Sequence, residues 1–184
     1  YIFGTKPYYG THPKTQYVLC ENEKDLLEKF LKLWKHCKPN IVTGWAITSY
    51  DIPYIVNRIS KILGFEVAKT LSTWNIIRPK TVQSKKWTIK TFDIYGLDVL
   101  DYMLLYEKYV GSNLENNKLD TVANHELGTK KLDYSEYGTL HKLYLGDYQK
   151  FIAYNFVDVE LVNQLDDKLK LIDLVATMAY EAKI

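Results

Sequence analysis

The chain is poor in cysteine, and this excludes two kinds of architecture. Its 184 residues include only two cysteines, Cys20 and Cys37, too few for a disulfide framework and without the spacing of a zinc site. The sequence also lacks a membrane-length apolar run, a signal peptide, a glycine-rich phosphate loop, a nucleophile elbow and an internal repeat. We therefore expect buried thiols, no membrane partner and a cytoplasmic location.

The overall charge says little about partners. The formal net charge is +2, which argues neither for nor against nucleic acid. With 47% apolar and 25% charged residues, the chain is long enough for one sizeable core. Apolar runs of strand length alternate with helical patterns, and this predicts an α/β domain.

Basic residues gather in one stretch. No acidic residue lies between Lys69 and Lys90, and alternation predicts a hairpin over about residues 73–92, with strands at 73–77 and 87–92 and a turn at 81–85. The candidate DNA-binding residues on it are Arg78, Lys80, Lys85, Lys86 and Trp87. Lysine and arginine suit phosphates, and tryptophan suits base stacking. The alternative is an edge hairpin whose lysines discourage strand pairing.

One acidic residue, Asp51, stands between an apolar strand and a helix. The β-branched run at 41–43 and Gly44 precede it, and apolar residues at helical spacing follow it over 52–59. Asp is a favoured N-cap residue, and Pro53 would then lie near the first helical position. The local sequence therefore fits a capping carboxylate, and a functional carboxylate is the other interpretation.

The pattern around Asp51 resembles the second exonuclease motif of family B DNA polymerases. That motif is Gly-Trp-x-x-x-x-(Phe/Tyr)-Asp-x-Pro-Tyr-x-x-x-Arg, matched here by Gly44, Trp45, Tyr50, Asp51, Pro53, Tyr54 and Arg58. In that family the aspartate helps to hold a divalent metal ion in the 3′-to-5′ proofreading site, so the resemblance implies a metal ligand. The family usually carries Asn five residues earlier, where this chain has Ala46, which offers no side-chain hydrogen bond.

A second motif follows about a hundred residues later. Tyr154-Asn155-Phe156-Val157-Asp158 resembles the family's third exonuclease motif, Tyr-x-x-x-Asp. The i, i+4 spacing places the phenol and the carboxylate on one helical face. The resemblance implies that Asp158 binds metal and that Tyr154 positions the attacking water. A surface pair on an amphipathic helix would look the same.

Segments between the two motifs agree with the resemblance. Residues 97–102 resemble the family's Val-Leu-Asp-Tyr segment, and 118–131 resemble Leu-Asp-x-Val-Ala followed by Leu-Gly-x-x-Lys. Lys131 matches the last lysine and could neutralise charge on the scissile phosphate. A solvated surface lysine is the alternative.

The resemblance implies a ribonuclease-H-like α/β domain. We expect a mixed sheet flanked by helices, with the hairpin as an insertion and a long C-terminal helix over about residues 148–182. Residues 1–184 would form part of the exonuclease domain of a phage replicative polymerase. The family's first motif, Asp-x-Glu, does not precede Asp51 here, so we expect the N-terminal strands to be missing and a sheet edge to be exposed.

In the family, hydrolysis of 3′-terminal nucleotides uses two Mg²⁺ or Mn²⁺ ions, one activating water and one stabilising the leaving oxygen. The expected partners are single-stranded DNA or a primer 3′ end and the remaining polymerase segments, in the same chain or another. Three functions remain open: a nuclease completed by another chain, a catalytically incomplete DNA-binding or structural fragment, and an unrelated α/β interaction module.

Overall fold

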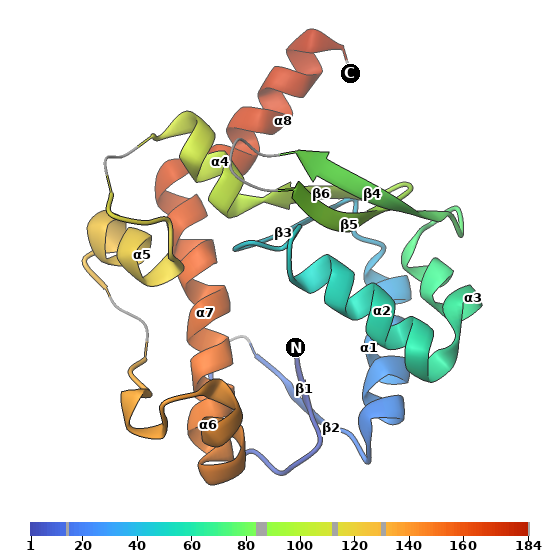
Figure 1. The fold of residues 1–184 in the computed structure, drawn as a ribbon, viewed down its shortest axis with the longest axis vertical. Coiled ribbons are helices and arrows are strands. Elements are labelled where there is room, and N and C mark those ends of the chain that lie inside the picture. The colour runs from blue at the N-terminus through green and yellow to red at the C-terminus, as the bar shows by residue number, and fades with distance from the viewer. Residues whose placement is uncertain (14, 84–87, 112–113, 130–131, 184) are drawn as a thin grey trace. The chain divides into compact units, whose positions relative to one another are not determined.

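The chain forms two compact units, which Figure 1 draws as one ribbon. The computed structural model describes residues 1–13, 15–83, 88–111, 114–129 and 132–183. The sheet unit comprises residues 20–102, and the helical unit comprises residues 1–19 together with 103–184. The two motif aspartates therefore belong to different units, Asp51 to the sheet unit and Asp158 to the helical unit.

The sheet unit mixes helices with two strand pairs. Its elements are α1 (Glu23–Cys37), β3 (Ile41–Gly44), α2 (Asp51–Leu63), α3 (Phe65–Ala68), the 3-10 helix η1 (Lys69–Leu71), β4 (Ile77–Gln83), β5 (Thr88–Ile94) and β6 (Asp98–Asp101). Strands β3 and β6 are parallel, with Gly44 opposite Asp101, and β4 and β5 are antiparallel, with Ile77 opposite Ile94. The carboxyl ends of β3 and β6 therefore meet.

Helix α1 begins with a capped first turn. The Asn22 side chain accepts the N–H of Asp25 at 3.0 Å, which satisfies one of the free donors of the first turn. The helix ends at Cys37, and Lys38 takes a left-handed conformation with φ 46°. Glu23 in the first turn pairs with Arg58 of α2, so the motif arginine joins the two helices.

The core of the sheet unit is aliphatic. Helix α2 buries Ile52, Val56 and Ile59, which recur at helical spacing and form one apolar face. They pack in a cluster with buried residues of α1, the β4–β5 hairpin and the segments beside them, namely Leu27, Leu31, Ile47, Ala68, Leu71, Ile77, Ile94 and Leu97. This packing fixes the position of α2, and therefore also the position of Asp51, its first residue.

The helical unit is built around one long helix. Its elements are β1 (Ile2–Gly4), β2 (Tyr17–Leu19), α4 (Tyr102–Tyr109, whose first residue belongs to the sheet unit), α5 (Leu119–Leu127), the 3-10 helix η2 (Ser135–Tyr137), α6 (Leu140–Gly146), α7 (Tyr148–Leu169) and α8 (Leu171–Ala182). Helices α5 and α6 pack against α7, as Figure 1 shows, and β1 pairs with β2 in parallel. None of the described helices is long and apolar enough to cross a membrane.

Polar and aromatic contacts tie the N-terminal segment to α7. The Tyr17 and Tyr148 hydroxyls lie 2.9 Å apart, and the Tyr9 N–H donates to Gln149 at 2.9 Å. The His12 ring stacks on Phe156 with 3.9 Å between centroids. The segment before β2 is therefore fixed along the same helix that carries the Tyr-x-x-x-Asp motif.

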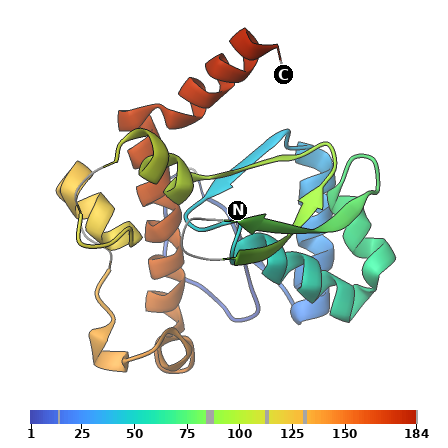
Figure 2. The same cartoon turned by 45° about the horizontal axis from the view of Figure 1, so that its top comes forward.

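The expected single helix over 148–182 is interrupted. Lys170 adopts a left-handed conformation with φ 53° and ends α7, and α8 then leaves in another direction, as Figure 2 shows. The Asp166 side chain accepts the N–H of Ile172 at 3.2 Å, which replaces a backbone bond at the break. This local side-chain contact was not visible in the amphipathic pattern of the sequence.

The expected hairpin is displaced along the chain. Residues 73–76 are not a strand, because the Ser72 hydroxyl accepts the N–H groups of Trp74 and Ile76, each at 3.1 Å, and holds them in a turn. Strand β4 instead continues through the expected turn to Gln83, which pairs with Thr88. The described strands form three separate pairs, so one central mixed sheet is not seen among them.

Candidate functional site

Asp51 lies at the first residue of α2 and does not cap it. The N-cap residue is Tyr50, which makes no side-chain capping bond, and Pro53 therefore lies at the third helical position. The capping interpretation of Asp51 is wrong, because the helix begins one residue earlier than the sequence suggested. Its carboxyl group is left available at the positive end of the helix dipole.

The turn before α2 has an unusual backbone at Ala46. Its φ of 60° lies in the left-handed region, which Gly and Asn tolerate better than Ala. The Ala46 carbonyl accepts the N–H groups of Ser49 and Tyr50, each at 3.1 Å, so the conformation is needed to close the turn. The family's usual Asn at this position suits that conformation, which gives a backbone reason for the Asn in addition to any contact of its side chain.

Asp101 is a residue at this site that the motifs did not single out. It ends β6 opposite Gly44, is 5% exposed, and its Oδ2 accepts the N–H of Thr48 at 3.0 Å. The 97–102 segment contained it, but no spacing in the sequence connects Asp101 with Asp51. Only the parallel pairing of β3 and β6 brings the two acidic residues to one end of the strand pair.

The electrostatics of Asp51 reflect this setting. Although Asp51 keeps an exposed surface, partial burial of its carboxyl raises its pKa, a bond from its own backbone N–H lowers the pKa, and the negative charge of Asp101 raises it. The net effect raises the pKa above the ordinary aspartate value. A cation beside these carboxylates would offset that cost.

Tyr154 and Asp158 are one turn apart on α7, as the spacing predicts. Tyr154 is 6% exposed and its hydroxyl hydrogen-bonds to Asp158, which is half-buried. Burial raises the pKa of Tyr154 far above the ordinary phenol value, and the charge of Asp158 raises it further. The phenol therefore stays protonated at neutral pH and acts as a hydrogen-bond donor.

Tyr134 is a second residue that sequence reasoning missed. Its ring meets that of Tyr154 edge-on, with 5.0 Å between centroids. Tyr134 thus helps to fix the ring of Tyr154. Its place three residues after Lys131 was the only available signal, and Lys131 itself lies outside the described residues.

Two of the basic hairpin residues have partners within the sheet unit. The Arg78 guanidinium lies over the Tyr95 ring, 5.3 Å from its centroid, and the Lys80 ammonium is 3.3 Å from a carboxylate oxygen of Asp93. The remaining candidates, Lys85, Lys86 and Trp87, lie outside the described residues. Whether the hairpin contacts DNA stays a prediction.

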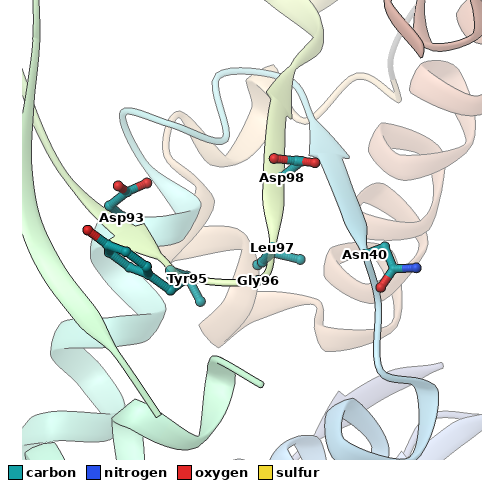
Figure 3. A pocket seen from close by; sticks show the side chains of 7 residues that line it. Asn40, Asp93, Tyr95, Gly96, Leu97 and Asp98 are labelled. Atoms are coloured by element: carbon teal, nitrogen blue, oxygen red, sulfur yellow. The ribbon is translucent and has the colours of Figure 1, made fainter. Parts of the chain in front are cut away.

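A pocket of the sheet unit lies away from Asp51. Asn40, Tyr95, Gly96 and neighbouring residues line it, with Asp98 at the first residue of β6 (Figure 3). Asp101 is at the opposite, carboxyl end of that strand. The pocket therefore lies at the amino end of β6, whereas ligands of α/β sheets bind outside the carboxyl ends of the strands.

The described residues do not assemble a complete metal centre. Among them, no group of three or more His, Cys, Asp or Glu side chains is arranged to hold a metal ion. The sheet unit brings Asp51 and Asp101 to one strand end, and the helical unit contributes Tyr154 with Asp158. A shared site for Asp51 and Asp158 stays a prediction, because the two residues belong to separate units.

Comparisons with known proteins agree on one family. The family model described as DNA polymerase family B, exonuclease domain, matches residues 6–122. The DNA-directed DNA polymerase of Enterobacteria phage T4 is 38% identical over 168 residues, which cover 91% of this chain and 18% of the phage protein. That of Escherichia phage RB69 is 39% identical over 171 residues, covering 93% and 19%. The DNA polymerase delta catalytic subunit of Caenorhabditis elegans is 30% identical over 165 residues, covering 83% and 15%.

The chain spans less than a fifth of the length of these relatives. The family model ends before α7, but the two phage alignments leave out less than a tenth of the chain. Such an alignment includes both Asp51 and Asp158, since each is more than a tenth of the chain from either end. The similarity therefore covers both units.

Proposed function

We propose a function for this chain from one premise: it belongs to the exonuclease domain of family B DNA polymerases. In the intact polymerase it forms part of a proofreading site that hydrolyses 3′-terminal nucleotides of DNA. The whole domain is ribonuclease-H-like, with β3 and β6 in one central mixed sheet. The observation that carries this proposal is the position of Asp51 after the carboxyl end of a parallel strand pair, where such folds place their chemistry.

We propose that Asp51 and Asp158 would hold the divalent metal in the intact polymerase. Carboxylate oxygens are ligands that Mg²⁺ and Mn²⁺ accept, so the donor chemistry of the two residues fits. When two such ions are bound, they supply an activated water and stabilise the leaving 3′ oxygen. The chain would contribute one carboxylate from the first residue of α2 and the other from α7.

Tyr154 orients the attacking water. Its phenol stays protonated, its hydroxyl is directed by Asp158, and its ring is held by Tyr134. Lys131 offsets negative charge on the scissile phosphate, as cations do in phosphoryl transfer.

The hairpin supplies the contacts to the DNA strand. Lys85, Lys86 and Trp87 bind the backbone and stack on a base, whereas Arg78 and Lys80 mainly support the hairpin through Tyr95 and Asp93. The partners are therefore a single strand or primer 3′ end and the remaining segments of the polymerase.

A second function is DNA binding by the isolated chain without efficient catalysis. It is favoured by the absence, among the described residues, of a group of three metal-ligating side chains. Two carboxylates make a poor Mg²⁺ site, since this ion demands octahedral oxygen coordination. We expect the isolated chain to degrade single-stranded DNA many orders of magnitude more slowly than an intact relative. Robust hydrolysis that Asp158→Ala abolishes would contradict this expectation.

The proposed function is tested in a complete polymerase. The matching segment of the phage T4 polymerase is replaced by this chain, and 3′-to-5′ digestion of single-stranded DNA is measured with Mg²⁺. We expect digestion to persist and to fall at least roughly 10²-fold in Asp51→Ala and in Asp158→Ala. Asp167→Ala is the matched control, because Asp167 is on α7 with its side chain 82% exposed. Equal activity of all three variants would refute the assignment.

A further inference from the structure

The carboxylate of Asp101 is buried at the base of the turn that carries Asp51. It is 5% exposed, although a buried charge is costly unless it is hydrogen-bonded. Its Oδ2 accepts the backbone N–H of Thr48 at 3.0 Å. Asp101 thus connects the end of β6 to the middle of the β3–α2 turn.

The rest of the turn bonds mainly to itself. The Ala46 carbonyl accepts both the N–H and the hydroxyl of Ser49, at 3.1 and 3.0 Å, and the Ile47 carbonyl accepts the N–H of Ile52 at 3.0 Å. The Thr48 N–H points instead toward the neighbouring strand. A displacement at Thr48 would therefore shift the whole turn, and Asp51 follows it by three residues.

We propose that Asp101 is a positioning residue for the metal-binding carboxylate of Asp51, acting through the Thr48 N–H. It needs no contact with metal or substrate itself. The inference rests on the proposed function, in which Asp51 holds the metal. Partners that orient a metal ligand typically change metal affinity by roughly 10–100-fold when they are removed.

The choice of side chain separates positioning from coordination. Asparagine keeps an oxygen that can accept the Thr48 N–H but loses the negative charge, whereas alanine loses both. Asp98 is the matched control, because it is an exposed aspartate at the other end of the same strand. Three variants of the full chain therefore suffice: Asp101→Asn, Asp101→Ala and Asp98→Asn.

Two NMR readouts are measured on each variant. The first is the chemical shift and the hydrogen-exchange rate of the Thr48 amide without metal. The second is the broadening of the Asp51 amide signal as Mn²⁺ is titrated. We expect Asp101→Ala to speed Thr48 exchange at least tenfold and to weaken Mn²⁺ binding by roughly 10–100-fold. We expect Asp101→Asn to restore both to within about threefold of the unmutated chain and Asp98→Asn to change neither.

The measurements distinguish a failure of the positioning role of Asp101 from a failure of the metal-ligand role of Asp51. Unchanged Mn²⁺ binding in Asp101→Ala overturns the positioning role alone. An Asp101→Asn variant that protects Thr48 yet binds Mn²⁺ as weakly as Asp101→Ala also overturns it, because the charge itself would then be needed. If Asp101→Ala does not fold, Asp101→Asn still tests the proposal, because Mn²⁺ binding at least tenfold weaker than in the unmutated chain, with Thr48 still protected, would overturn it. An unmutated chain with a protected Thr48 and no Mn²⁺ broadening overturns the metal-ligand role of Asp51 in this chain, and with it the role given to Asp101, whereas the proposed function of the intact polymerase is tested separately by the Asp51→Ala chimera.

Discussion

The two units hold their motif aspartates by different means. Asp51 depends on a turn whose shape needs a left-handed Ala46 and a tie to Asp101, about fifty residues further along the chain. Asp158 depends on helix periodicity, which alone places Tyr154 beside it. One carboxylate is thus fixed by tertiary structure and the other by local structure. Substitutions far along the chain should therefore disturb the position of Asp51 more than that of Asp158.

The interiors of the units also differ. Both units bury aliphatic side chains, and the helical unit adds polar and aromatic ties to α7. Glu126 of α5 is one such tie, since it accepts from Tyr106 of α4 at 2.8 Å and from Lys168 of α7 at 2.9 Å. The difference is best tested by changing one unit at a time.

The largest effect is expected from Ile59→Ala in the sheet unit. Ile59 is fully buried, so the smaller side chain and the cavity it leaves should cost about 2–5 kcal/mol of unfolding free energy. Amide exchange should accelerate within residues 20–102 and change little within 103–183. Val159→Ala, at a site 64% exposed on α7, is the control and should have little effect. Equal acceleration in both units would show that they unfold together.

A smaller effect is expected from Glu126→Gln in the helical unit. Burial raises the pKa of Glu126, but hydrogen bonds from Lys168 and Tyr106 outweigh it, so the pKa is lower in the folded state. The contribution is therefore present above the ordinary glutamate range and is lost as the pH falls through the folded pKa. We expect a loss of about 1.5 kcal/mol at pH 7.

Denaturant unfolding of the Glu126→Gln variant and the unmutated chain, followed from pH 7 to pH 3, checks this dependence. The gap between them should narrow toward acid, because both side chains are then neutral. A gap that stays constant over this range would mean that the carboxylate charge has no role.

Ala46→Gly should stabilise the sheet unit slightly. The left-handed conformation costs Ala roughly 1–2 kcal/mol, and the greater freedom of Gly in the unfolded chain removes part of the gain. We expect a net gain of about 0.5–1 kcal/mol in chemical denaturation. Ala46→Asn should give a smaller gain in the free energy of unfolding. A loss of stability in both variants would argue against the turn described at Ala46.

The smallest effect concerns the hairpin of the sheet unit. Lys85→Ala with Lys86→Ala should flatten the salt dependence of single-strand binding, by about 0.7 in the logarithmic slope for each phosphate that the variant no longer binds. Lys80→Ala is the matched control and should change the slope less, because Lys80 already pairs with Asp93. Salt titrations that overlay for all three proteins would leave only the edge-protection role.

Local signals predicted much of this structure. The apolar face of α2 and the Tyr154–Asp158 pair both follow from spacings within a few residues. The Ser72 turn and the break at Lys170 did not, because side-chain bonds overrode strand and helix patterns there. The sequence did not predict that Asp101 lies beside the Asp51 turn. The pairing of β3 with β6 makes it a neighbour of that turn, although the two are far apart in the sequence.

The buried side chain of Tyr154 has a consequence for kinetic work on the chimeric polymerase that tests the proposed function. Because burial raises the pKa of this phenol, it should contribute no descending limb just above neutral pH to a plot of exonuclease rate against pH. Loss of activity above neutrality should then be assigned to another ionisation. A phenylalanine replacement should lower the rate by a similar factor at every pH tested, so that the two profiles run parallel.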